Sequence, residues 1–194
     1  MTSIQTIPIL QQILKKYAAF ETEVVEFTSE LLKPWCHNCK GECCKTDCCR
    51  ETLDSSFLSL LVTQYPPRAK FSALDGWLTK NGCALGVGRP PVCYEFLCDR
   101  VLNARPAILY RYAMDVLSKL VSHVGQRAVG RSHLVEVMDP SDLSAINHDS
   151  YGRRLTEARK AFKVVKSILA EKSLSKDAVH SLSRISKPPH GLIL

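Results

Sequence analysis

The sequence lacks any apolar run long enough to cross a membrane, and it has no recognisable secretory leader. Its longest apolar stretches, such as LLVT and FKVVKSILA, fall well short of the roughly 20 residues that a spanning helix needs. The first residues, MTSIQTIPILQQILKK, show neither a basic lead nor a small-residue cleavage site. These absences predict a cytoplasmic protein that has no membrane among its partners.

Familiar catalytic motifs are missing as well. The chain has no Gly-rich phosphate loop, no Ser-His-Asp ordering typical of a triad, and no paired carboxylates beside its cysteines, so a hydrolase has no support.

Its 194 residues are 45% hydrophobic and 23% charged, which is ordinary for a globular protein. We expect a single domain over residues 1–185, followed by a tail at residues 186–194.

The formal net charge of +7 raises the question of nucleic acid as a partner. Basic residues do gather on one face of a predicted C-terminal helix, at Arg159, Lys163 and Lys166. No aromatic residues are interleaved with them, and a charged face opposite an apolar seam is what any bundle helix shows. A solvated helix face is therefore predicted, and nucleic acid is not an expected partner.

Apolar periodicity predicts a mainly α protein. Spacings of three and four residues indicate helices over residues 9–32, 55–64, 106–124 and 150–171. The segment VCYEFLCDRVL is expected to form a helical turn or two. Pro34 is expected to end the first of these helices, and the segment HLVEV is the one candidate strand. The predicted architecture is a helical bundle with an irregular cysteine-rich metal-binding layer and at most one short strand pair.

Cysteine is the residue that is present in unusual number, with nine in the chain. In a reducing compartment, clustered cysteines bind metal or carry out redox chemistry more often than they form disulfides, and an odd count excludes complete pairing. The cysteines form a local run and a distant group, namely Cys36, Cys39, Cys43, Cys44, Cys48 and Cys49, then Cys83, Cys93 and Cys98.

Common single-site signatures do not fit this spacing. A thioredoxin-like pair at Cys36 and Cys39 would follow a strand, whereas here a predicted helix precedes it and four more thiols follow closely. Lys40 replaces the histidine that a c-type haem site requires, and Glu42 stands where a ferredoxin run needs cysteine. A ligand set split between the local run and the distant group remains. All-sulfur ligation selects zinc or an iron–sulfur cluster.

The segments CHNCKGECC and GCALGVGRPPVCYEFLC resemble the CxxCxxCC family, whose cysteine-cluster domain chelates zinc or iron. The match covers residues 36–44 and 83–98. By position, the resemblance implies a metal site formed by Cys36, Cys39, Cys43, Cys44, Cys83, Cys93 and Cys98.

Arg89 permits two interpretations. Its guanidinium could donate to a cluster sulfur or to nearby carbonyls, or the sequence Arg-Pro-Pro could be a rigid turn that sets the approach of Cys93. His37 could ligate zinc, but with nine sulfurs available we expect a solvated loop histidine. The remaining histidines show no metal-binding spacing and are predicted at the surface, at positions 123, 133, 148, 180 and 190.

Three functions follow as hypotheses. The first is a metal-binding protein that holds zinc or an iron–sulfur cluster for redox chemistry or metal handling. The second is an iron–sulfur-dependent modifying enzyme with a substrate pocket between the cluster and the helices. The third is a structural-zinc module that binds an acidic protein partner through the basic helix.

Overall fold

The computed structural model describes residues 8–36, 45–80, 82–104, 106–171 and 175–192. The mainly α class is confirmed. The helices are α1 (Pro8–Cys36), α2 (Thr46–Asp54), α3 (Ser56–Gln64), α4 (Val92–Glu95), α5 (Asp99–Ala104), α6 (Ile108–Gly125), α7 (His148–Glu171) and α8 (Lys176–Ser183), with 3-10 turns η1 (Leu134–Glu136) and η2 (Pro140–Ala145). None of the described helices is both long and apolar enough to span a membrane.

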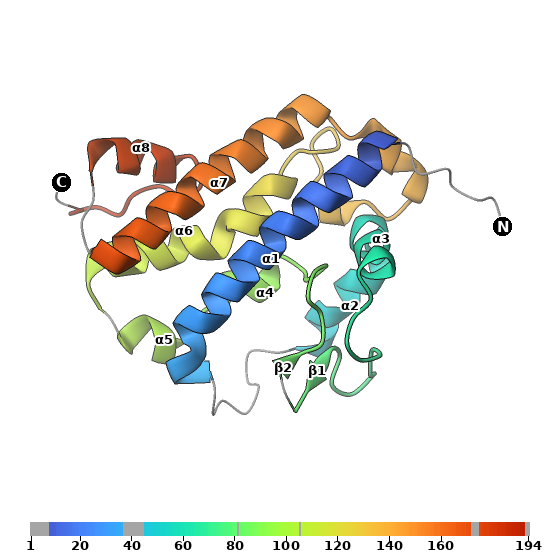
Figure 1. Ribbon diagram of the computed structural model, residues 1–194, viewed down its shortest axis with the longest axis horizontal. Coiled ribbons are helices and arrows are strands. Elements are labelled where there is room, and N and C mark those ends of the chain that lie inside the picture. The colour runs from blue at the N-terminus through green and yellow to red at the C-terminus, as the bar shows by residue number, and fades with distance from the viewer. Residues whose placement is uncertain (1–7, 37–44, 81, 105, 172–174, 193–194) are drawn as a thin grey trace.

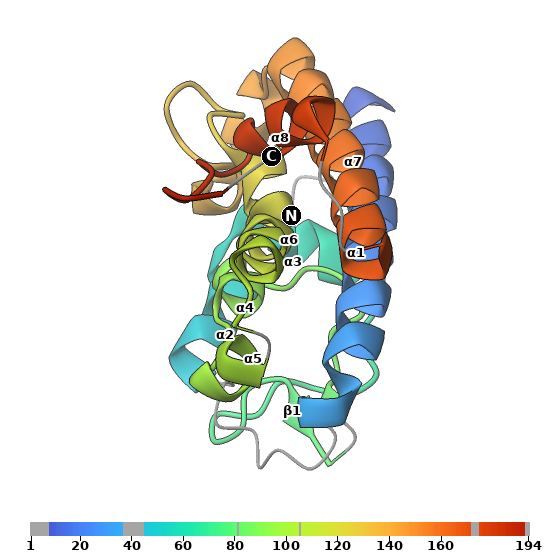
Figure 2. The ribbon, with the colours of Figure 1, turned by 90° about the vertical axis from the view of Figure 1, so that its left-hand side faces the viewer.

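Three long helices form the centre of the molecule. In Figure 1, α1 and α7 run in the same direction across the molecule and α6 runs the opposite way. Figure 2 shows α6 on one side and the α1–α7 pair on the other. Their apolar stripes meet because residues three and four apart share a helix face. The buried side chains include Tyr17, Phe20 and Val24 of α1, Leu117, Leu120 and Val124 of α6, and Ala158, Phe162 and Val165 of α7.

The cysteine-bearing segments lie at one end of this core, with α2, α3 and a small hairpin (Figure 1). The hairpin pairs β1 (Leu78–Thr79) with β2 (Gly82–Cys83) in antiparallel register, and it is the only sheet within the described residues. The expectation of at most one strand pair is thus confirmed. We name residues 46–98 the cysteine layer.

The prediction of a strand at HLVEV is wrong, because the three central residues of this segment form η1. His133 caps the turn: its Nδ1 accepts from the Val135 amide at 3.2 Å, and its own amide donates to the Glu136 carboxylate at 2.8 Å. Leu134 and Val135 are both buried. Consecutive buried side chains do not fit the alternation of a half-exposed strand.

Several helix boundaries differ from the predictions, by one to four residues. α1 continues through Pro34 to Cys36. Pro34 lies in the last turn of α1, and the helix extends only two residues beyond it. α6 begins at Ile108, two residues after Pro106. Two helices were not predicted at all, α2 and α8, because each is short and carries few periodic apolar residues.

Two histidines were wrongly predicted at the surface. His123 is buried, and its Nε2 lies 2.9 Å from the Glu157 carboxylate; burial lowers the pKa of this histidine. His133 is half-buried, with its Nε2 at 2.7 Å from the Ser122 carbonyl oxygen. The other predicted surface histidines are exposed, at positions 148, 180 and 190. His37 lies outside the described residues.

The C-terminal segment docks on the core. The Tyr112 hydroxyl donates to the Ser186 carbonyl at 3.0 Å, and the Lys119 ammonium lies 3.1 Å from the Ser186 hydroxyl. Leu192 packs against the main core cluster.

Candidate metal centre

The last turn of α1 brings Cys36 to the cysteine layer. Cys36 is exposed at the C-terminal end of the helix. Because α1 is continuous from the apolar core to this residue, the position of Cys36 is set by the packing of Tyr17, Phe20 and Val24 along the same helix. A rigid helix end is a more precise support for a ligand than a loop is.

Cys36 lines a pocket together with two cysteines from the distant group. This cavity of about 360 Å³ is bordered by Cys36, Cys93, Cys98 and Arg89, with Tyr94 and Leu97 among its apolar walls; we name it the cysteine pocket. Cys93 lies in α4 and Cys98 directly precedes α5. Segments far apart in the sequence therefore meet around one small space.

A buried carboxylate fastens the distant segment to α1. Glu21 is fully buried in the middle of α1. Its carboxylate accepts hydrogen bonds from the Gly88 amide at 2.8 Å, the Arg89 amide at 2.9 Å and the Tyr94 hydroxyl at 2.6 Å. Two of these donors belong to the loop that precedes Cys93, and the third directly follows it. We name these contacts the Glu21 clamp.

The electrostatics of the clamp are dominated by burial. Removal from water raises the pKa of Glu21, although the donors from Tyr94, Gly88 and Arg89 act in the opposite direction. Burial also raises the pKa of the Tyr94 hydroxyl, and the neighbouring Glu21 carboxylate adds to this effect. Tyr94 therefore remains a neutral donor to Glu21 at any ordinary pH.

Arg89 lies between the cysteines of the distant group. Its Nε and Nη2 donate to the Leu85 carbonyl at 3.0 and 2.8 Å, which closes a turn before Pro90. Burial lowers the pKa of the guanidinium, but the nearby Tyr94, Cys83, Glu21 and Cys93 raise it by more, so the net pKa is above its usual value. The arginine thus combines both predicted features, a rigid turn and a positive charge beside thiols.

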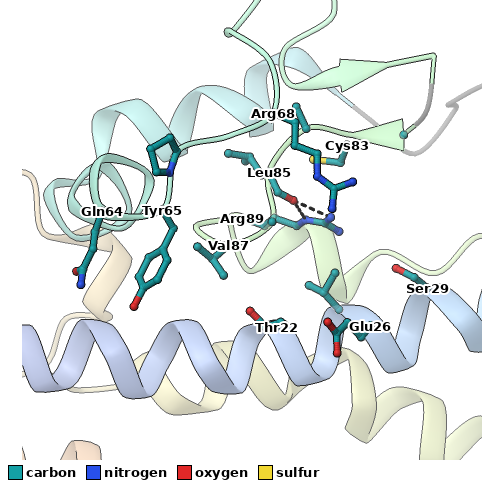
Figure 3. A pocket seen from close by; sticks show the side chains of 15 residues that line it. Thr22, Glu26, Ser29, Gln64, Tyr65, Arg68, Cys83, Leu85, Val87 and Arg89 are labelled. Atoms are coloured by element: carbon teal, nitrogen blue, oxygen red, sulfur yellow. Dashed lines mark hydrogen bonds between the residues drawn. The ribbon is translucent and has the colours of Figure 1, made fainter.

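Cys83 lies in a second cavity, next to the cysteine pocket. Arg89 borders both cavities, as do Val25 and Ser29 of α1. Figure 3 shows the Cys83 side chain close to the ends of Arg68 and Arg89. Cys83 is half-buried and packs against the small cluster around Trp77.

The predicted ligand set is only partly described. Cys36, Cys93 and Cys98 share one pocket and Cys83 adjoins it, whereas Cys39, Cys43 and Cys44 lie outside the described residues. Among the described residues, no three histidine, cysteine or acidic side chains are grouped closely enough to hold a metal ion. The described thiols fit a soft metal in their chemistry.

Cys49 has a packing role that the sequence left open. It is buried against Trp77 and Leu85, and the Trp77 indole donates to its backbone carbonyl at 3.3 Å. Gly76, at φ +61°, approaches so closely that an added Cβ would lie 2.8 Å from the Cys49 sulfur. Cys49 is therefore a core residue of the cysteine layer, while Cys48 is half-buried in the same helix.

Sequence patterns did not reveal Glu21 or Arg68 as site residues. A signal for Glu21 did exist, because it lies four residues after Tyr17 and three before Val24, on the apolar face of its helix. Arg68 follows a proline pair and carries no such signal. Comparison with known proteins finds no matching family model, no similar curated protein and no similar solved structure.

Proposed function

We propose that this chain binds zinc or an iron–sulfur cluster through cysteine thiolates drawn from residues 36–44 and 83–98. The observation that carries the proposal is that Cys36 shares a pocket with Cys93 and Cys98. The spacing of these cysteines is similar to that of the CxxCxxCC family, which supports the same conclusion.

The arrangement suits metal binding for a physical reason. Thiolates gathered at one place repel each other, and a metal ion offsets this repulsion while it joins the end of α1 to the distant segment. The guanidinium of Arg89 reduces the remaining negative charge, since it interacts favourably with charged Cys83 and Cys93. The Glu21 clamp holds Cys93 near Cys36 before any metal arrives, which lowers the entropy cost of forming the site. A bound cluster would supply one-electron redox chemistry, whereas zinc would supply cross-linking alone.

Anaerobic purification followed by elemental analysis and a visible spectrum tests the proposal. We expect at least one equivalent of metal per chain. Iron with sulfide would give a brown protein that bleaches on reduction, and zinc would give a colourless one. A preparation that contains less than one equivalent of any metal, and whose thiols all react freely, would contradict the proposal.

A matched pair of variants tests the position of the site. Cys93→Ser removes a pocket sulfur, and we expect it to lower the metal content well below that of the wild type. Val92→Ser places the same side chain one position earlier, at an exposed residue of α4, and should leave the metal content unchanged. Equal metal content in the two variants would exclude Cys93 as a ligand.

One observation favours a second function, the iron–sulfur-dependent modification of a substrate. The cavity beside Cys83 measures about 770 Å³, which is large enough for a small molecule. If the cluster takes part in turnover, addition of a substrate should bleach the visible spectrum without any added reductant. A spectrum that responds only to added reductants would leave metal handling or electron transfer as the function.

The third hypothesis, a structural zinc that supports a basic docking helix, has less support. Within the described part of the chain, two of the three basic side chains on this face of α7 already have intramolecular contacts. Arg159 pairs with Glu23 at 3.1 Å and lies over the Phe20 ring, and Lys166 lies 4.6 Å from the centre of the Phe162 ring.

A further inference from the structure

The larger cavity is a built pocket with walls of different chemistry. One wall is α1 and the other is the chain from the end of α3 through residues 82–89 (Figure 3). We name it the arginine pocket, bordered by Arg68, Arg89, Tyr65, Cys83, Glu26 and Ser29. Its volume of about 770 Å³ lies within the usual range for small-molecule sites.

The side chains of Arg68 and Arg89 both line this pocket, and Figure 3 shows their guanidinium groups near Cys83. Neither forms an ion pair with a described carboxylate. Arg89 donates through Nε and Nη2 to a single carbonyl, that of Leu85. Its Nη1 forms no hydrogen bond with another described residue. The side chain of Arg68 makes no hydrogen bond to another described residue, while its backbone amide is anchored to the Ala84 carbonyl at 3.1 Å.

Two neighbouring guanidinium groups that form no ion pair with a described carboxylate create a positive field that an anion can neutralise. Arginine presents a planar fork of donors that matches carboxylate and phosphate oxygens. The partly buried position of Arg89 strengthens such an interaction, because the local dielectric is lower than in water.

The opposite wall carries different groups. Thr22, Glu26 and Ser29 follow each other on one face of α1 and line the pocket, since residues three and four apart share a helix face. In Figure 3, the Tyr65 side chain extends from the end of α3 toward α1. A ligand in this pocket would therefore meet donors for an anion on one wall, and a carboxylate and two hydroxyls on the other.

We propose that the arginine pocket binds a small molecule whose carboxylate or phosphate group lies at Arg68 and Arg89 and whose polar or cationic end faces Glu26. This inference goes beyond the metal-binding proposal, because the guanidinium and carboxylate groups that it uses do not depend on a bound metal.

Isothermal titration calorimetry of the full chain tests the inference at fixed ionic strength. The probes are inorganic phosphate, glutarate and glutamate, with sodium chloride as the reference. We expect saturable binding of at least one oxyanion at millimolar concentration or below. The comparison of phosphate with glutarate identifies the anionic group. Glutamate should bind more tightly than glutarate, because its ammonium can pair with Glu26, and Glu26→Gln should remove that difference.

The decisive variant is Arg68→Gln, an exposed position where folding should not change. Loss of a charge-assisted hydrogen bond should weaken binding by about tenfold or more. Arg131→Gln, also exposed but outside the pocket, removes the same charge and should bind as the wild type does.

Three results would overturn the inference: no saturable heat from any probe, equal affinity in Arg68→Gln and the wild type, or an equal loss in both arginine variants. Repeating the titration after chelation separates this inference from the metal proposal. A metal-free chain that still binds the anion through Arg68 supports the pocket whatever the metal content proves to be.

Discussion

The three-helix core and the cysteine layer are held together by different forces. In the core, the buried residues of α1, α6 and α7 are almost all apolar and recur at helical spacing. The cysteine layer contributes apolar side chains such as Phe57, Leu58 and Leu61 of α3 to this core. Its own separate apolar cluster is small and consists of Cys49, Trp77 and Leu85. Its loops are also held by hydrogen bonds to backbone groups, such as Thr52 to the Gly88 carbonyl at 2.9 Å and Thr46 to the Leu74 carbonyl at 2.8 Å.

This difference separates two kinds of stability. Apolar packing is non-directional and spread over many residues, so one buried side chain can be truncated without loss of the topology. Polar bonds are directional and few, so a single partner such as Glu21 can position a whole segment. The segment that Glu21 positions is the one that carries Cys93 and Arg89.

The largest loss in the free energy of unfolding is expected when a buried side chain of the three-helix core is truncated. Leu120→Ala removes a fully buried side chain of α6 and should lower the free energy of unfolding by about 4 kcal/mol, because it leaves a cavity. Urea unfolding followed by circular dichroism measures the loss. Peptide mapping after thiol labelling without urea should show Cys83 as protected as in the wild type. Faster labelling of Cys83 in the folded variant would mean that the two regions are more tightly coupled than their contacts indicate.

Removing the Glu21 clamp should cause a somewhat smaller loss in the free energy of unfolding, together with a local change in the reactivity of Cys83. Glu21→Ala leaves the Gly88 and Arg89 amides and the Tyr94 hydroxyl without their acceptor, which should cost about 3 kcal/mol. Here Cys83 should label faster than in the wild type even without urea, since the loop that follows it is released.

The control for this variant is Glu23→Ala, on the same helix. Glu23 forms an exposed ion pair with Arg159, and such pairs contribute about 0.2–1 kcal/mol. If Glu21→Ala is no more damaging than Glu23→Ala, the clamp does not order the cysteine layer.

The smallest expected effect is the pH dependence of the free energy of unfolding that Glu21 contributes. Burial raises the pKa of Glu21 above its ordinary value of 4.5, so the folded chain keeps a proton that the unfolded chain releases as the pH rises past that value. The contribution of Glu21 to the free energy of unfolding should therefore be greatest in acid. It should fall with rising pH and level off above the folded-state pKa. Urea titrations from acid to neutral pH measure this slope.

Glu21→Gln has no titrating group at this position and should lack that part of the slope, whereas Glu23→Gln should retain it. The same slope in Glu21→Gln and the wild type would show that burial does not raise the pKa of this carboxyl in the folded chain.

The candidate site was accessible to prediction only in part. The spacing predicted a ligand set split between the local run and the distant group, and the family resemblance implied Cys36, Cys93 and Cys98 among its members. These three residues line one pocket. The spacing did not distinguish Cys49, whose burial against Trp77 depends on contacts across the hairpin loop. The arginine pocket was not visible in the sequence at all, because its lining comes from several separate segments and no motif connects them.

The sequence by itself determined the long helices and their buried faces, because the three- and four-residue periodicity of apolar side chains is a local property of the chain. It also determined that sulfur ligands were available in number. Only the tertiary structure decided which of the described cysteines meet, that a carboxylate within an apolar helix face would hold their loop, and that two arginines would line a cavity beside them. These features depend on contacts between distant residues, and their geometry is set by how the whole core packs.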